Sequence, residues 1–164
     1  MRPLLVLLLI LGGTVAIATP ANALPAFVCG AQTGGSTKVH SHITDVRVGR
    51  HLRFDRFVVQ FSTALLPHYR VSAKKTSTFI LDPSGRTVHL LGRAGVNLVM
   101  HSVTGNGTYS GRTDFRPRFP QLREARRLGD FEGFVSWGLG LHRASCTRVF
   151  KLSNPTRLVV DVPH

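Results

Sequence analysis

Short runs in which apolar and polar residues alternate recur along most of this 164-residue chain. In the run DRFVVQFS, residues 55–62, alternation places Phe57, Val59 and Phe61 on one face of an extended chain, because successive strand side chains point to opposite faces. Gly, Pro, Asn and Asp separate similar runs at 43–49, 68–73, 77–82, 86–92, 95–105, 134–141, 147–153 and 156–162. The pattern predicts an all-β fold, either an antiparallel β-sandwich of about 8–10 short strands or a barrel, and we take the sandwich.

Residues 121–130, QLREARRLGD, fit two predictions. Their composition favours a short helix with Pro120 near its first position. Leu122, Glu124, Arg126 and Leu128 also alternate as they would in a strand.

The first 23 residues have the composition of an export signal. Arg2 precedes an apolar run, and the run ends at Ala21-Asn22-Ala23, a cleavage site of the A-x-A type. The apolar part contains a Gly pair and is short for a membrane helix, which needs about 20 residues. We therefore expect residues 1–23 to be a signal peptide and the protein to be secreted, with no stable membrane span after cleavage; an uncleaved anchor is the alternative.

The chain has two cysteines, Cys29 and Cys146. In an oxidising compartment such a pair most simply forms a disulfide, and a reactive thiol or a metal pair are the alternatives. The bridge would tie a Gly-rich lead-in, residues 24–42, to a late strand of a single domain, residues 43–164. Closing a loop of about 118 residues would add ~4 kcal/mol to the free energy of unfolding in the chain-entropy model.

Basic residues outnumber acidic ones, with 21 Lys and Arg against 8 Asp and Glu, and most of them are Arg. Guanidinium groups bind carboxylate and phosphate in a two-pronged way, and a positive field attracts anionic polymers. For an exported chain we expect the partner to be a wall polymer, an acidic glycan or a lipid headgroup, and we expect no nucleic acid. A generic basic surface that keeps the protein in solution is the alternative.

Five charged residues lie at strand starts or within the most regular strands: Asp55, Arg56, Glu132, Arg157 and Asp161. One interpretation is structural and pairs Arg157 or Arg56 with Asp161, Asp55 or Glu132, because half-buried charges need partners. The other interpretation is functional, with the same groups lining a polar groove for a glycan.

Trp137 is the only Trp of the chain, and it alternates with Val135 and Leu139. That alternation predicts that its ring packs in the core. The alternative is a surface ring that stacks on a sugar, which would make Trp137 a binding residue.

Small residues surround this Trp strand. Ser136, Gly138 and Gly140 make up most of its other face, which another backbone or a ligand can therefore approach closely. At its start we expect Glu132 to occupy a corner, with its carboxylate accepting hydrogen bonds from backbone or Arg groups and Gly133 permitting the turn.

No catalytic motif is present in the sequence. Glycoside cleavage needs two acids, and the pair to consider joins Glu132 to Asp55 or Asp161. His40 and His42 share a strand face, but they lack the acidic or Cys companions that would support a metal site. We therefore expect no enzyme activity, no cofactor and no metal.

Three stretches resemble the AMIN-like domain of secreted and lipid-anchored actinobacterial proteins: RFDRFVVQF (53–61), GDFEGFVSWGLGL (129–141) and RVFKLSNPTRLVVDVPH (148–164). The resemblance covers most of residues 43–164 and implies a strand, not a helix, at 121–130. That family is similar to the AMIN domain, a noncatalytic β-sandwich of cell-wall amidases and secretins that is understood to bind peptidoglycan or to target division-site machinery. One departure lies before Asp55, where the family usually carries a Gly and this chain has Arg53 and Phe54.

Together these observations predict a noncatalytic protein of the cell envelope. Its surface arginines would bind peptidoglycan or another anionic wall polymer. The alternatives are an interaction domain for another envelope protein and a wall hydrolase that uses Glu132.

Overall fold

The computed structural model describes residues 23–106 and 108–164, which contain strands and no helix. The expected signal peptide lies outside the described residues except for its last one. The strands are β1 (Gln32–Gly34), β2 (Ser41–Arg50), β3 (Phe54–Phe61), β4 (Tyr69–Lys74), β5 (Thr78–Leu81), β6 (Arg86–His89), β7 (Ala94–His101), β8 (Val103–Thr104), β9 (Asp114–Phe115), β10 (Leu122–Phe131), β11 (Phe134–Leu141), β12 (Arg148–Leu152) and β13 (Arg157–Pro163). The all-β prediction is confirmed. Three of these strands, β1, β8 and β9, have only two or three residues and so carry no periodic signal.

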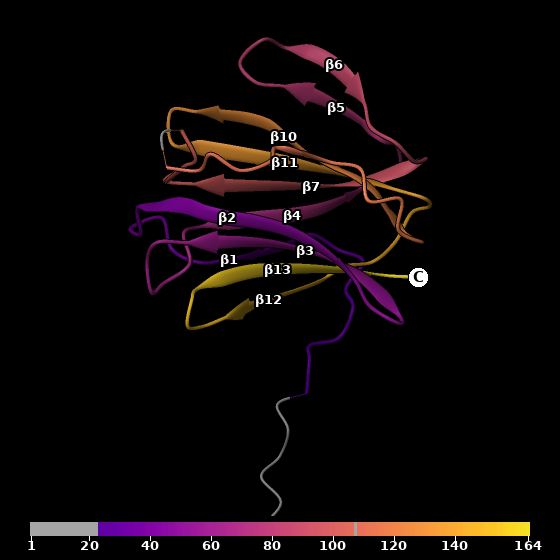
Figure 1. The fold of residues 1–164 in the computed structure, drawn as a ribbon, viewed down its shortest axis with the longest axis horizontal. Helices are drawn as coiled ribbons and strands as arrows, with labels where there is room; N and C mark the ends of the chain where they lie inside the picture. Colours follow the sequence, from indigo (N-terminus) through magenta and orange to yellow (C-terminus); the bar gives the residue numbers. More distant parts are fainter. Residues whose placement is uncertain (1–22, 107) are drawn as a thin grey trace, which may run out of the picture.

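The strands form three layers (Figure 1). A six-stranded sheet, in the order β1-β4-β7-β11-β10-β9, faces a five-stranded sheet, in the order β12-β13-β3-β2-β8. The hairpin β5–β6 lies over the outer face of the six-stranded sheet. Every pairing between the named strands is antiparallel except the short one between β2 and β8. The molecule is therefore a β-sandwich, not a barrel.

The core lies between the two large sheets and is built from the inward faces of β3, β7, β11 and β13. Trp137 is fully buried there, with its ring centroid 5.2 Å from that of Phe57, so its predicted place in the core is confirmed. Burying each side chain of this kind contributes about 1.5–3 kcal/mol.

Residues 122–130 lie in a strand, as the family resemblance implies, and the alternative prediction of a short helix is wrong. β10 pairs with β11 along its length, with register shifts between Leu122 and Glu124 and between Arg127 and Gly129. Leu122 and Ala125 both belong to the main core although they are three residues apart. The first of these irregularities moves side chains to the other face, which produces a helix-like spacing within a strand.

The hairpin β5–β6 packs on the outer face of β10 and β11 around a small second core of Phe79, Leu90 and Leu128. The approach is close because β11 carries glycines on that face. A Cβ at Gly140 would lie 2.3 Å from the carbonyl oxygen of Leu91. The prediction that another chain segment can approach this face of β11 is confirmed.

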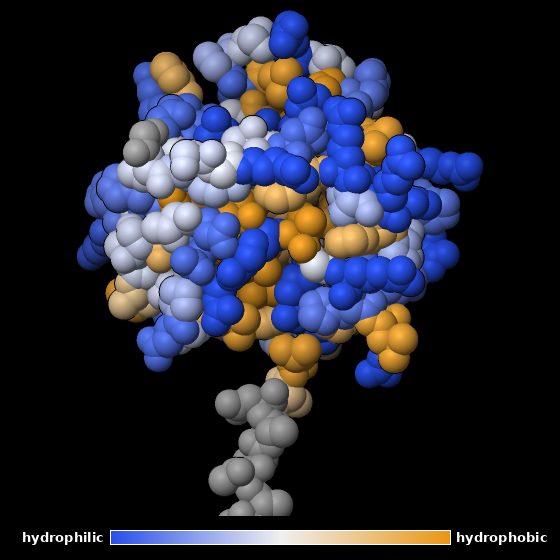
Figure 2. Space-filling model, viewed as in Figure 1, coloured by the Kyte–Doolittle hydropathy of each residue, from blue (hydrophilic) through white to orange (hydrophobic). Residues whose placement is uncertain are grey.

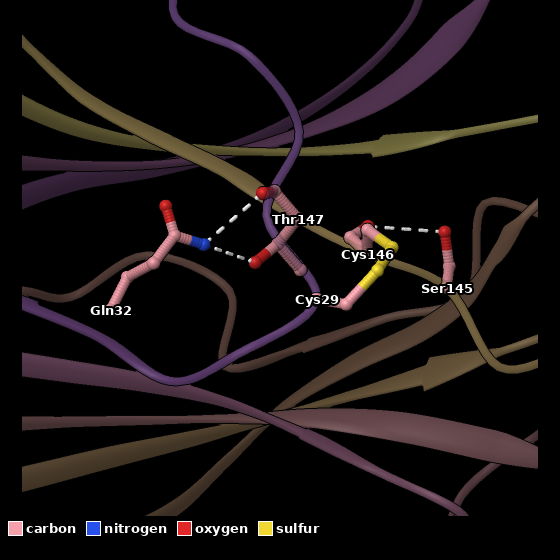
Figure 3. Close-up of a disulfide and its surroundings, with 5 residues drawn as sticks. All are labelled: Cys29, Gln32, Ser145, Cys146 and Thr147. Atoms are coloured by element: carbon pink, nitrogen blue, oxygen red, sulfur yellow. Dashed lines mark hydrogen bonds between the residues drawn. A yellow bond between two sulfur atoms is a disulfide. The ribbon is translucent and has the colours of Figure 1, made fainter.

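The disulfide joins Cys29 to Cys146, as predicted (Figure 3). It fastens the segment before β1 to the start of β12. Beside it, the amide of Gln32 donates hydrogen bonds to the carbonyl oxygen and to Oγ1 of Thr147, at 3.1 and 2.7 Å (Figure 3). Val28 and Thr147 also exchange backbone hydrogen bonds, so the covalent link is reinforced on both sides.

Candidate functional site

The carboxylate of Asp161 is the centre of a buried ion cluster on the outer face of the five-stranded sheet. Asp161 lies on β13, directly opposite Arg56 of β3 and Arg148 of β12. Arg56 donates from Nε to Oδ1 and from Nη2 to Oδ2, at 2.7 and 2.9 Å. Arg148 donates from Nε and Nη2 to Oδ2, at 3.0 and 2.6 Å. The predicted Arg56–Asp161 pair is present, and Arg148 is a second partner that sequence reasoning missed.

Aromatic rings enclose the two guanidinium groups. The guanidinium carbon of Arg148 lies 4.6 Å from the ring centroid of Phe27 and 4.8 Å from that of Phe54. That of Arg56 lies 5.1 Å from Phe54 and 5.3 Å from Phe150. Cation–π contacts of this kind add to the ion pairs when solvent is excluded. Because Asp161 is buried and both its oxygens are occupied, the arrangement favours a structural role.

Asp55 forms a separate clamp at the start of β3. Its Oδ2 accepts hydrogen bonds from the backbone N–H groups of Gln121 and Leu122, both at 2.8 Å. Its Oδ1 lies 3.0 Å from Nε2 of His164. The side chain is fully buried, so it joins β3, the start of β10 and the last residue of the chain. Its partners are backbone groups and a histidine, so the alternative that paired Asp55 with Arg56 or Arg157 is not the one the structure has.

Arg157 and Glu132 lie apart from both of these groups. Arg157 donates to the carbonyl oxygens of Pro155 and Ser153, at 3.1 and 3.5 Å, and within the described residues it pairs with no carboxylate. Glu132 occupies the β10–β11 turn with φ 49°, so the expected corner is correct. Its carboxylate accepts no hydrogen bond from the described part of the chain, and that expectation is wrong. Glu132 instead lines a groove under the hairpin β5–β6.

The residues selected from the sequence therefore do not form one site. They occupy the ion cluster, the clamp, the core, a turn and a strand end. The sequence also did not predict which surface arginines lie near one another in the fold. Figure 2 shows hydrophilic residues over most of one face of the molecule, with apolar patches between them.

A shallow basin at one end of the six-stranded sheet gathers basic side chains. Arg93, Arg118, Arg123 and His142 line it, together with Leu91 and Gly92. These residues come from the segment after β6, the loop before β10, β10 itself and the end of β11. Among the described residues, none of the three guanidinium groups makes a hydrogen bond or ion pair. Unpaired guanidinium groups suit a phosphate or carboxylate ligand.

A model of the AMIN-like domain family matches residues 41–164, from the start of β2 through β13. This chain belongs to the AMIN-like family. Comparison with curated proteins and with solved structures finds no match. The described part of this AMIN-like chain contains no helix with the length and hydropathy needed to cross a membrane. Cys29 and β1 precede the matched region, so the disulfide attaches a segment outside the match to the AMIN-like sandwich.

Proposed function

We propose that this protein is a noncatalytic, exported domain of the cell envelope that binds peptidoglycan or another anionic wall polymer. Its membership of the AMIN-like family supports a wall-associated role. The composition of residues 1–23 supports export. The excess of arginine supports an anionic ligand.

The observation that carries the proposal is the basic basin. Arg93, Arg118 and Arg123 have no acidic partner in the described chain, although a free guanidinium group readily pairs with a carboxylate. A phosphate or carboxylate of the polymer would receive two-pronged hydrogen bonds from them. Each exposed contact contributes little on its own, so the affinity would depend on several of these arginines acting together.

The positions of the acids support a noncatalytic role. The hydrolase hypothesis needs Glu132 together with Asp55 or Asp161. Asp55 and Asp161 are both fully buried, and their oxygens already accept hydrogen bonds. Neither carboxylate is available to a sugar, so neither acid pair named by the hydrolase hypothesis can flank a glycosidic bond.

Sedimentation with isolated cell walls tests the proposal. The protein without residues 1–23 is mixed with walls at low and high salt, and the bound fraction is measured. We expect stronger binding at low salt than at high salt, because salt screens the exposed charges of the basin. A triple variant, Arg93→Gln, Arg118→Gln and Arg123→Gln, should bind roughly tenfold more weakly.

The matched control removes the same charge from exposed arginines outside the basin: Arg50→Gln, Arg70→Gln and Arg86→Gln. We expect this control to lose less than about threefold in affinity, since only the general field changes. Equal losses in the two triple variants would contradict a role for the basin. Failure of the unmodified protein to sediment at low salt would contradict wall binding itself.

A further inference from the structure

A groove of about 480 Å³ lies between the hairpin β5–β6 and the outer face of the six-stranded sheet. Its volume is within the range of small-ligand sites, about 300–1,000 Å³. The turn between β10 and β11 contributes Phe131 and Phe134, which are 52% and 50% exposed, and the hairpin contributes Ile80. The groove therefore presents apolar surface, including two aromatic side chains, that the rest of the described chain leaves half uncovered.

Within the described residues, the polar side chains of the groove form no hydrogen bond or ion pair, although Lys74 Nζ lies 5.4 Å from the ring centroid of Phe79. These side chains belong to Lys74, Asp82, Asn97, Glu132 and Ser136. Together they offer both donors and acceptors. Their hydrogen-bonding capacity is available to a ligand.

The two carboxylates in the groove differ from the other carboxylates of the chain, which have Arg or His partners. The other six carboxylates each lie within 4 Å of an Arg or His nitrogen of the described chain: Asp45, Asp55, Asp114, Glu124, Asp130 and Asp161. Asp82 and Glu132 are the exceptions, and both line the groove. In a chain with 21 Lys and Arg, these two carboxylates make the groove unsuitable for an anionic polymer.

The mixture of groups indicates the chemistry of the ligand. Sugar hydroxyls both donate and accept hydrogen bonds, which suits carboxylates, an amide, a hydroxyl and an ammonium group in one groove. The apolar C–H face of a sugar ring suits exposed aromatic side chains. The two carboxylates outnumber the single ammonium group of Lys74, so the groove would also attract a cationic ligand, and the test below includes one.

We propose that this groove binds an uncharged segment of a glycan chain, with Phe131 and Phe134 against the sugar rings and Asp82 and Glu132 accepting hydrogen bonds from hydroxyl groups. This inference rests on the proposed function for the source of the glycan. It assigns the glycan to a different surface from the basin, so the two modes of binding differ in their response to salt. The basin holds anionic groups through screened charges, whereas the groove holds neutral sugars.

Titration calorimetry with a soluble chitin oligosaccharide, which is uncharged, tests this assignment. We expect binding whose affinity changes little between low and high salt, because no net charge is neutralised. The double variants Phe131→Ser with Phe134→Ser, and Asp82→Asn with Glu132→Gln, should each bind roughly tenfold more weakly. These side chains are exposed, so we expect the variants to fold normally, which a thermal unfolding measurement checks.

The basin triple variant is the control, and it should bind the oligosaccharide with unchanged affinity. Absence of binding by the unmodified protein, or unchanged affinity in both groove variants, would overturn the groove proposal. If a basic apolar peptide binds and the oligosaccharide does not, the groove proposal is also overturned, and the groove is better interpreted as a site for a protein partner. If the unmodified protein binds the oligosaccharide but shows no salt-sensitive binding to walls, the proposed role of the basin is contradicted and the groove assignment stands.

Discussion

Replacing Asp161 by Asn removes the charge that holds two arginines together on the outer face of the five-stranded sheet. The native carboxylate accepts four hydrogen bonds, at 2.6–3.0 Å, from Arg56 and Arg148. Asp161 is fully buried, and the Arg56 and Arg148 side chains are 19% and 10% exposed. The variant keeps the shape of the side chain and one carbonyl acceptor, so it isolates the loss of charge.

The magnitude follows from the burial. Removing one partner of a buried ion pair costs about 3–5 kcal/mol, because the remaining charge stays poorly hydrated. Summing four charge-assisted hydrogen bonds at about 1.5–3 kcal/mol each overestimates the loss, because the guanidinium groups keep some hydration and their ring contacts. We therefore expect a loss of about 3–5 kcal/mol, equivalent to a fall in melting temperature of roughly 10–20 °C for a domain of this size.

Chemical and thermal unfolding, followed by the fluorescence of Trp137, measures this loss. Asp45→Asn is the matched control, because Asp45 pairs with Arg47 at 3.2 Å and the two side chains are 36% and 50% exposed. An exposed pair contributes less than about 1 kcal/mol, so the control should melt within a few degrees of the native protein. The reasoning is refuted if Asp161→Asn costs no more than Asp45→Asn.

Three further changes test other parts of the structure. Cys29→Ala with Cys146→Ala should lower the free energy of unfolding by up to about 4 kcal/mol in denaturant titrations and leave the β-type circular dichroism in place. Gly140→Val should displace the hairpin β5–β6 from the sheet and increase hydrogen exchange there, whereas unchanged exchange would contradict the close packing. Burial raises the pKa of both Tyr69 and Tyr109, the only two tyrosines, so phenolate absorbance should develop at higher pH in the native protein than in urea. Since the native state holds these protons more tightly, stability should decline as pH rises above about 10, and coincident titration curves would contradict this.

Alternation in the sequence predicted which side chains enter the core wherever a strand is regular. Phe57, Val59 and Phe61 all face inward, as do Val135 and the other alternating residues of β11. Alternation failed where strands are irregular. Ile43 and Val46 both lie in the core although simple alternation puts them on opposite faces, because the register shifts between Ile43 and Asp45.

The candidate sites were less predictable, because they depend on which strands become neighbours. The partnership of Arg148 with Asp161 follows from the antiparallel register of β12 and β13, which places the two residues opposite each other. The short turn between β12 and β13 fixes that register, so the sequence alone could have predicted that Arg148 lies opposite Asp161. The groove could not be predicted in this way. Its walls come from β4, β5, β7, β10 and β11, and its shape depends on where the hairpin β5–β6 lies.

Binding without cleavage is most directly tested by incubating the protein with radiolabelled isolated walls for many hours at low salt. We predict that the protein sediments with the walls and that no labelled fragment enters the supernatant. Release of soluble sugar fragments, abolished by Glu132→Gln, would contradict the noncatalytic role. Protein that stays in the supernatant would contradict binding.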